Sequence, residues 1–416
     1  MDIINEDEFS MNINMLNNYC LEKIFMYLSI DERFELEKVC EKWKIISQNA
    51  WHDIVTLYYG DHFHRMKNFN VDSSTVVDYI EKILTRCGKY LLSLTLTRID
   101  DSIVLPVINK YCLKLKILKL FLTSWVNEDF TNVFDNLKKL ASLDIIFHGS
   151  YNIPIDFVNS IEALGETLES FSLTDDYLET KYKFLSIEWI PIIENFKCLN
   201  SLAIIGFKMD KIFLKNICEI KTLESLTLAD IIFDGEIESI DLISNIKNLK
   251  YLSIMQIEQV DDIFIEKISN NCINLEKLYL QPATHCTDFG ILNLLQLKKL
   301  NTLSLKLSDE FDDVIGITDT SLRRFSNMKE FDCGGCWNIT NDSIINIINH
   351  SPELEKLNIR RTSVSIETIM HAVNITKKRT NNITLNIEAN TSQLPDNFFS
   401  LKIYESPFLK IKLVEL

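Results

Sequence analysis

Glycine and proline are scarce in this chain, with ten and seven copies among 416 residues. Few glycines are left for loops that cradle phosphate groups, and the sequence has no P-loop, HExxH or Gly-x-Ser-x-Gly motif. Neighbouring carboxylates do occur, as at Asp175 and Asp176 or Asp312 and Asp313, and exposure to solvent explains them. The sequence therefore does not support an enzyme active site, and we expect no catalytic residue, no metal and no cofactor.

Long apolar runs and basic clusters are also missing. No segment has the roughly eighteen consecutive apolar residues of a membrane-spanning helix, and the acidic N-terminus lacks the features of a secretion signal. The formal net charge is -16 and the longest basic run is Lys377–Arg379, which disfavours nucleic acid and anionic membranes as partners. We therefore expect an intracellular protein, in the cytoplasm and/or the nucleus, that binds other proteins.

The ten cysteines are expected to be reduced thiols in that environment. Cys333 and Cys336 form the only Cys-x-x-Cys pair, which could be a redox pair or half of a zinc site. No second pair stands at a suitable spacing, and His62 and His64 likewise lack a third ligand. We interpret the two cysteines as buried structural residues and the two histidines as exposed residues of a connecting segment.

The chain is instead rich in one spacing, Leu-x-x-Leu-x-Leu. Apolar residues alternate with polar or small ones in its last four positions, which predicts a short strand with one buried face. Such a strand is stable only when stacked on its neighbours, where each fully buried leucine contributes about 1.5–3 kcal/mol. The spacing starts 24 to 31 residues apart, at Leu91, Leu115, Leu140, Leu168, Leu199, Leu223, Leu249, Leu275, Leu300, Met328 and Leu354.

These repeats predict an α/β solenoid, a horseshoe with parallel strands inside and helices outside. The first unit begins with a helical pattern over residues 76–84 and ends in the strand after Leu91. Later units carry residues that cap helix starts, such as Thr287, Thr318 and Thr340. We expect about eleven repeats over residues 75–387, and then a cap over residues 388–416 that covers the last strand edge.

A different pattern precedes the repeats. We expect a disordered leader at residues 1–14 and a small all-α module at residues 15–56. Residues 57–74 should connect the module to the solenoid, without a Gly/Ser-rich linker. Ser29 and Asp31 mark a break between two apolar stripes, so we expect two or three short helices. The stripes consist of Leu21, Ile24, Phe25 and Leu28, and of Leu36, Val39, Cys40 and Trp43.

The run from Leu16 to Trp51 resembles an F-box, whose pattern joins a helix ending in Ile-Phe-x-x-Leu to a Val-Cys-x-x-Trp segment. One position departs from it, because Asn17 stands where the family usually has proline after leucine. The resemblance implies that the module binds the Skp adaptor of a cullin-RING ubiquitin ligase. The positions that match the docking surface are Leu16, Leu21, Ile24, Phe25, Leu28, Val39, Cys40 and Trp43.

The repeats carry a second resemblance. Cys272-Ile273-Asn274-Leu275 and the segment from Cys333 to Thr340 are similar to the cysteine-containing class of leucine-rich repeat, which commonly follows an F-box. Together the two resemblances imply a non-catalytic substrate receptor of a Skp-cullin-F-box ligase, with the Skp adaptor, cullin and RING subunits as partners. A protein substrate, which the sequence does not identify, would bind on the concave face and be ubiquitinated.

The polar face of the predicted strands offers candidate substrate contacts. This face lies opposite the buried leucines. Its residues are apolar in the middle of the array and basic toward the C-terminus, where Lys306 and Arg360 could bind an acidic or phosphorylated segment. A strand register shifted by one residue would instead place the apolar positions in the core, and a solvated surface would explain the basic ones. The candidates are Phe121, Ile146, Ile205, Tyr251, Met255, Tyr279, Lys306 and Arg360.

Two alternative functions stay open. The helical module could merely cap the first repeat, which would make the protein an interaction scaffold that recruits no ligase. In that case Leu21, Phe25 and Trp43 should be buried inward, whereas a docking module should leave apolar surface for a partner. The second alternative is RNA binding by the basic C-terminal strands, which the net charge disfavours.

Overall fold

The computed structural model describes residues 13–60, 73–99, 102–149, 152–176, 182–185, 187–234, 237–307, 316–393 and 406–414. The chain divides into two compact units, Met1–Ile145 with Pro154–Leu164 and Ile146–Ile153 with Gly165–Leu416. His62, His64, Asp312, Asp313 and most of the predicted leader lie outside the described residues.

Three short helices open the first unit: α1 (Asn18–Met26), α2 (Ile30–Leu36) and α3 (Glu41–Asn49), followed by the 3-10 turn η2 (Ala50–Asp53). Ser29 and Glu32 form a capping box that starts α2, as the break in the sequence predicted. The second predicted stripe is wrong as a single helix, because Leu36 ends α2 and Cys40 is the N-cap of α3. We call residues 13–53 the helical module.

The expected α/β repeat architecture with a parallel sheet is confirmed. In the first unit, strands β1 (Thr56–Tyr59), β2 (Ser93–Ile99) and β3 (Ile117–Leu122) pair in parallel, and β4 (Ser142–Phe147) follows them in the sheet. Strand β1 thus starts at the last residue of the predicted module and continues into the segment predicted as a connection over residues 57–74. Leucines of the repeated spacing point into the core, since Leu94, Leu118 and Leu143 are all fully buried.

The second unit continues the pattern. Its strands follow one another in the order β5 (Ser170–Asp175), β7 (Ser201–Ile205), β9 (Ser225–Ala229), β11 (Tyr251–Met255), β12 (Lys277–Gln281), β13 (Thr302–Ser304), β14 (Glu330–Asp332), β15 (Lys356–Asn358), β16 (Leu385–Asn390) and β17 (Leu409–Val414). Strand β17 pairs with β16 in parallel, and β16 extends three residues beyond the predicted end of the repeats at residue 387.

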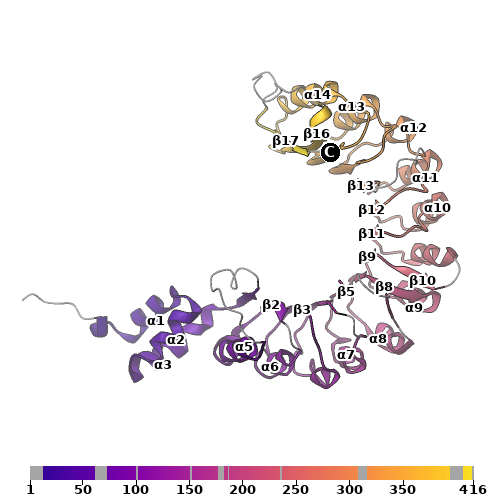
Figure 1. Ribbon diagram of the computed structural model, residues 1–416. Helices are drawn as coiled ribbons and strands as arrows, with labels where there is room; N and C mark the ends of the chain where they lie inside the picture. The colour runs from indigo at the N-terminus through magenta and orange to yellow at the C-terminus, as the bar shows by residue number, and fades with distance from the viewer. Residues whose placement is uncertain are drawn as a thin grey trace, which may run out of the picture. The chain divides into compact units, whose positions relative to one another are not determined.

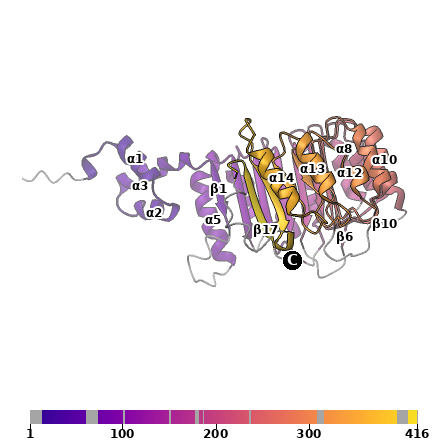
Figure 2. The ribbon, with the colours of Figure 1, turned by 90° about the horizontal axis from the view of Figure 1, so that it is seen from above.

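The helices cover the opposite side of each unit from the strands (Figure 1). They are α5 (Ser73–Cys87), α6 (Val104–Tyr111) and α7 (Ile155–Ile161) in the first unit, and α8 (Ile190–Asn195), α9 (Lys211–Cys218), α10 (Asp262–Asn271), α11 (Asp288–Asn293), α12 (Asp319–Leu322), α13 (Asn341–His350) and α14 (Ile366–Thr376) in the second. Neighbouring repeats stack their helices, as α13 and α14 do in Figure 2.

Local sequence accounts for several helix starts. Thr287, Thr318 and Thr340 are the N-caps of α11, α12 and α13, and each side chain accepts a hydrogen bond from a backbone N–H in the first turn. The prediction that these threonines cap helices is confirmed. Elsewhere a 3-10 turn replaces the α-helix, as in η4 (Asn127–Phe130) and η7 (Ile237–Asn245).

The repeat pattern did not predict a second, smaller sheet in the second unit. Strands β6 (Lys183–Phe184), β8 (Phe207–Asp210) and β10 (Ile232–Asp234) pair in parallel. Gly206 joins β7 to β8 with a φ of 82°, a left-handed conformation that glycine adopts without strain. Beside this turn, Lys183 and Asp175 form a buried ion pair with an N–O distance of 2.6 Å.

Candidate functional site

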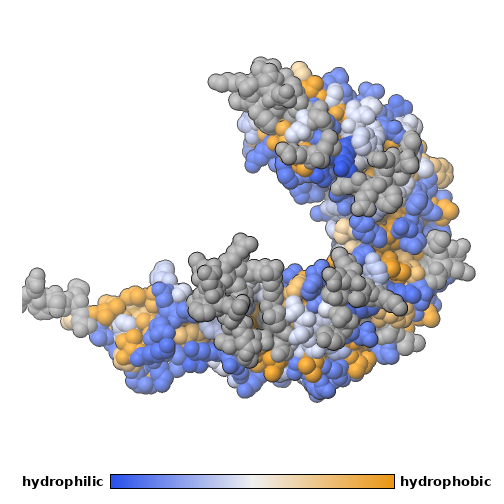
Figure 3. Space-filling view, in the orientation of Figure 1, coloured by the Kyte–Doolittle hydropathy of each residue, from blue (hydrophilic) through white to orange (hydrophobic). Residues whose placement is uncertain are grey.

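The helical module exposes an unusual number of large apolar side chains (Figure 3). Tyr27 is 92% exposed and Tyr19 67%, although both belong to the segment that forms and ends α1. Monomeric proteins rarely leave contiguous apolar surface uncovered without an interaction to explain it. The exposed apolar residues of the module are Ile13, Met15, Leu16, Tyr19, Ile24, Tyr27, Val39 and Ile45.

The predicted adaptor-binding residues fall into two groups. Leu16, Ile24, Val39 and Cys40 are exposed, whereas Leu28 and Trp43 are half-buried. Leu21 and Phe25 are buried, which corrects the expectation that they form part of the contact surface. They pack with Ile46 and Ala50, and Leu28, Leu36, Trp43 and Met26 surround that core.

The burial of Leu21 and Phe25 does not turn the module into a cap. Both side chains lie in a core made by α1, α3 and η2, not in a core shared with the first repeat. The apolar residues on the outer side of α1, including Ile24, stay exposed. The module therefore buries its own core and still presents an apolar surface.

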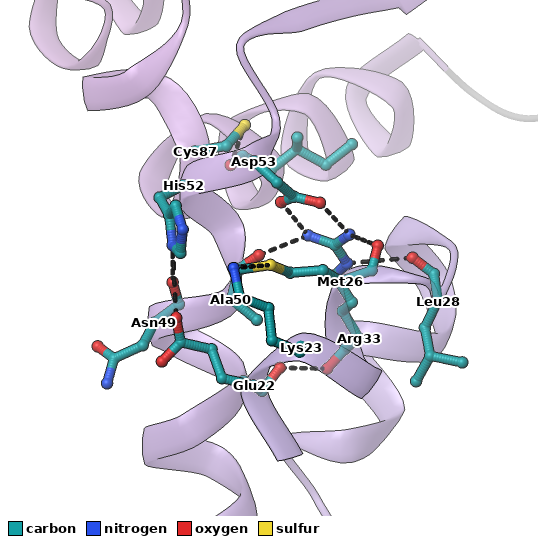
Figure 4. A network of polar contacts seen from close by, with 12 residues as sticks. Glu22, Lys23, Met26, Leu28, Arg33, Asn49, Ala50, His52, Asp53 and Cys87 are labelled. Carbon is teal, nitrogen blue, oxygen red and sulfur yellow. Dashed lines mark hydrogen bonds and ion pairs between the residues drawn. The ribbon is translucent and has the colours of Figure 1, made fainter. Parts of the chain in front are cut away.

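A buried guanidinium holds the module together (Figure 4). Arg33, on α2, donates to both carboxylate oxygens of Asp53, at 2.7 and 2.8 Å. It also donates to the backbone carbonyls of Met26 at 2.5 Å and Ala50 at 2.7 Å. The Arg33 side chain is 4% exposed, so these contacts satisfy a charge that would be costly to bury alone. Apolar periodicity gave no signal for this ion pair.

Helix α2 also joins the module to the first repeat. The guanidinium of Arg86, on α5, donates to both carboxylate oxygens of Glu37 at 3.0 and 2.9 Å, which raises the pKa of Arg86. The Tyr79 hydroxyl, also on α5, donates to Asp31 at 2.7 Å. The ring of Phe34 lies 6.4 Å from that of Tyr79. The join is packed, and it uses α2 rather than the exposed apolar side of α1.

The polar face of the repeats carries the predicted substrate contacts. In β3, Phe121 is half-buried between the buried Leu120 and Leu122. In the second unit, Ile205 is half-buried and alternates with buried residues of β7. Tyr251 and Met255 are half-buried at the two ends of β11, whose three middle residues are buried. The shifted register is therefore excluded for the six candidates within strands, which are half-buried on the face opposite the buried leucines: Phe121, Ile146, Ile205, Tyr251, Met255 and Tyr279. Lys306 and Arg360 are also half-buried, and they follow β13 and β15 outside the strands.

The C-terminal strands are not the basic surface that the sequence suggested. Lys356 pairs with Glu330 at 3.0 Å, one strand away. Lys412 contacts Glu388 at 2.8 Å, and Arg360 reaches the same carboxylate at 3.9 Å. Because carboxylates of neighbouring strands offset these cations, the expectation of a net basic face is corrected to one of mixed charge.

Comparison with known proteins agrees with this geometry. Residues 13–53 match the family model of the F-box domain. A chain from the complex of Rad7 and Elc1 in yeast has a similar fold, with a TM-score of 0.50 and 14% identity over 92% of this chain and 98% of that chain. This chain carries an F-box domain followed by leucine-rich repeats.

Two bacterial structures resemble it more weakly. An internalin (inlF) from Listeria monocytogenes str. 4b F2365 gives a TM-score of 0.46 and 15% identity, over 89% of this chain and 87% of the internalin. A leucine-rich-repeat protein of Leptospira interrogans gives 0.35 and 16%, over 73% of this chain and 80% of that one.

Asn17 takes the place that proline usually has in the F-box pattern. It is the N-cap of α1, and its side-chain oxygen accepts a hydrogen bond from the Cys20 N–H at 2.8 Å. A capping asparagine and a proline both favour a helix start, by different means. The departure from the family pattern therefore leaves α1 with a well-formed beginning.

Cys333 and Cys336 of the leucine-rich repeats are buried in the core. The thiol of Cys333 contacts the carbonyl of Asn358 at 3.5 Å, and that of Cys336 contacts the carbonyl of Leu305 at 3.7 Å. Burial raises the pKa of Cys336 to about 12, so it stays a neutral thiol at physiological pH. Within the described ranges, no three His, Cys, Asp or Glu side chains are grouped to hold a metal, and no helix is long and apolar enough to cross a membrane.

Proposed function

We propose that this chain is the substrate-recognition subunit of a Skp-cullin-F-box type ubiquitin ligase. The F-box would bind the Skp adaptor and, through it, the cullin and RING subunits, while the polar face of the repeats would bind a protein substrate. The observation that carries the proposal is the match of residues 13–53 to the F-box, on a module whose apolar side chains are exposed. The fold-related yeast chain comes from a complex of two proteins, Rad7 and Elc1, which is consistent with an adaptor partner.

The adaptor contacts follow from exposure. We assign direct contact to Leu16, Ile24, Val39 and Cys40, and to Tyr27 beside them. Leu21, Phe25, Leu28 and Trp43 would act by supporting that surface from below, because they form or border the module's core. The exposed side of α1 stays available because α2 makes the contacts with the repeats.

The mechanism would be positional. The chain would hold a substrate near charged ubiquitin and so raise the effective concentration of the reacting groups, without a catalytic residue of its own. Such a receptor would work in the cytoplasm, the nucleus or both. The packed join between the F-box and the first repeat favours this role, because a stiff connection preserves the geometry between an adaptor and the neighbouring repeats.

Adaptor binding tests the proposal. The affinity of a purified Skp-type adaptor should be measured for the wild type, Ile24→Asp and the matched control Met370→Asp. Ile24 is 40% exposed on α1 and Met370 is 43% exposed on α14, so the two substitutions place the same charge at equally exposed helical sites. We expect a loss of about tenfold or more for Ile24→Asp alone, since a contact residue in an apolar interface contributes on this scale.

The buried residues are poor test positions. Phe25→Ala or Trp43→Ala would disturb the module's core, so a loss of binding would not distinguish contact from folding. If the folded wild type, checked by circular dichroism, does not bind the adaptor, the ligase proposal is wrong. The chain would then be an interaction scaffold whose F-box recruits no ligase.

A further inference from the structure

A cavity of about 230 Å³ lies on the polar face of the last repeats in the second unit. This volume falls below the range of about 300–1,000 Å³ that is typical of small-molecule pockets, and it suits a single side chain. Strands β12 to β16 line it, and their row of paired residues is Tyr279, Ser304, Asp332, Asn358 and Glu388. Thr302 and Ser304 are each 2% exposed and line the bottom of the cavity beside Tyr279.

The carboxylates around the cavity differ in their partners. Glu330 is paired with Lys356 at 3.0 Å and Glu388 with Lys412 at 2.8 Å. For Asp332, none of the lysines and arginines that the structure describes comes within ion-pair distance of the carboxylate. The Asp332 carboxylate accepts the backbone N–H of Gly334 at 2.9 Å. Asp332 therefore keeps a charge that no described cation offsets at close range.

The burial of Asp332 also favours the binding of a cation beside it. It raises the pKa of this carboxyl, against hydrogen bonds from Gly334, Asn358 and Ser304 and the more distant charge of Lys306, which lower it. A partly desolvated carboxylate without a close counter-ion gains more from an incoming cation than an exposed carboxylate does. The cavity therefore offers an anionic group that is suited to receive a positive charge.

Two tyrosines stand at the β12 end of the cavity. Tyr279 lines the cavity, and its ring centroid lies 5.4 Å from that of Tyr251 on β11. The face of an aromatic ring attracts cations, and the planar guanidinium of arginine can stack on it. Arginine can also donate two parallel hydrogen bonds to a carboxylate, which an ammonium group does less well.

We propose that this cavity binds one basic side chain, best an arginine, of the protein substrate. Asp332 receives the charge and Tyr279 stacks on the planar group. This inference rests on the proposed function, because it names the chemistry of the substrate that the repeats would recognise. An acidic or phosphorylated segment fits less well, since Lys356 and Lys412 are already paired with carboxylates.

Selection from a display library of random peptides, with the purified full chain as target, tests the proposal. We expect the selected peptides to share an arginine or lysine at one position. Replacing that residue by neutral citrulline in a selected arginine peptide, or changing Asp332→Asn in the protein, should each weaken binding about tenfold or more. Selected peptides without a basic residue, a selection that yields no peptide, or equal binding to Asp332→Asn would each overturn the proposal.

Two further variants test whether the effect of Asp332→Asn on peptide binding is specific to this cavity. Asp144→Asn is the matched control, because Asp144 also lies on the polar face, in β4, but is already paired with Lys119 at 2.6 Å. It should leave peptide affinity unchanged. Tyr279→Ser removes the stacking ring and should weaken binding even if Asp332→Asn proves unstable. Circular dichroism checks that each variant is folded.

Failure of this inference can be told apart from failure of the proposed function. Peptide binding requires neither the adaptor nor the F-box surface. If the adaptor binds but the selected peptides are not basic, only the substrate chemistry is wrong. If basic peptides bind at Asp332 but the adaptor does not bind, the proposed binding of a basic side chain is supported and the chain is an interaction scaffold.

Discussion

The carboxylate of Asp288 holds Thr318 of the next repeat by two hydrogen bonds, from the backbone N–H at 2.9 Å and from the hydroxyl at 2.5 Å. Asp288 lies in the first turn of α11, and Thr318 is the N-cap of α12. The same arrangement links Asp262 to Thr287 and Asp319 to Thr340. The start of each helix thus fixes the start of the next one, in addition to the stacking of the strands.

Asp288→Ala should therefore destabilise the contact between two repeats. The substitution removes the two hydrogen bonds from Thr318 and a third from the Ser321 hydroxyl, and losing these charge-assisted bonds at a part-buried site is expected to cost about 2 kcal/mol or more. Hydrogen exchange of the α11 and α12 amides would show the loss as faster local opening. Asp288→Asn keeps one acceptor oxygen and should lose less. Equal protection in the wild type and Asp288→Ala would show that strand stacking alone sets the repeat geometry.

Arg33→Met should destabilise the F-box while leaving the repeats of the second unit folded. The substitution removes the donors that satisfy Asp53 and the carbonyls of Met26 and Ala50. Breaking a buried ion pair from one side costs about 3 kcal/mol, somewhat less here because the Asp53 side chain is 31% exposed. Hydrogen exchange over residues 18–53 measures the effect. Asp53→Asn, which keeps an acceptor for Arg33, is the milder comparison.

Gly206→Ala should weaken the small sheet of β6, β8 and β10. A Cβ at this position would lie 2.2 Å from the carbonyl oxygen of Asp175, and the φ of +82° is unfavourable for alanine. Strain of this kind costs on the order of 1–3 kcal/mol. Thermal unfolding should show a lower midpoint for Gly206→Ala. An unchanged midpoint would mean that the chain near Asp175 shifts without cost.

Asp332 should make the local stability of β14 depend on pH in a particular direction. Because burial raises its pKa in the folded chain, its favourable contribution is complete below the unfolded pKa and declines as pH rises through the folded value. The stability of the wild type relative to Asp332→Asn should therefore fall as pH rises from the ordinary pKa of 3.8. Hydrogen exchange of residues 330–334, corrected for intrinsic rates, measures it in both proteins. A wild type that becomes more stable relative to Asp332→Asn as pH rises would contradict the raised pKa of Asp332.

The sequence determined the repeat and the direction of its side chains. Alternation of apolar and polar residues is local, so it fixed which face of each strand is buried, as Leu278 and Leu280 are around the half-buried Tyr279. The helix starts could also be predicted from the sequence, because a threonine such as Thr318 accepts a hydrogen bond from the backbone of the first turn that follows it. The F-box was recognisable for the same reason, since its pattern lies within one short segment.

Only the tertiary structure decided which apolar residues of the F-box are surface and which are core. Leu21 and Ile24 belong to one apolar stripe, yet packing against Ile46 and Ala50 buries the first and leaves the second exposed. The sequence did not predict the ion pairs either, because partners such as Lys356 and Glu330 lie on neighbouring strands and are 26 positions apart in the chain. Periodicity describes one segment at a time, whereas such contacts depend on which segments the fold brings together.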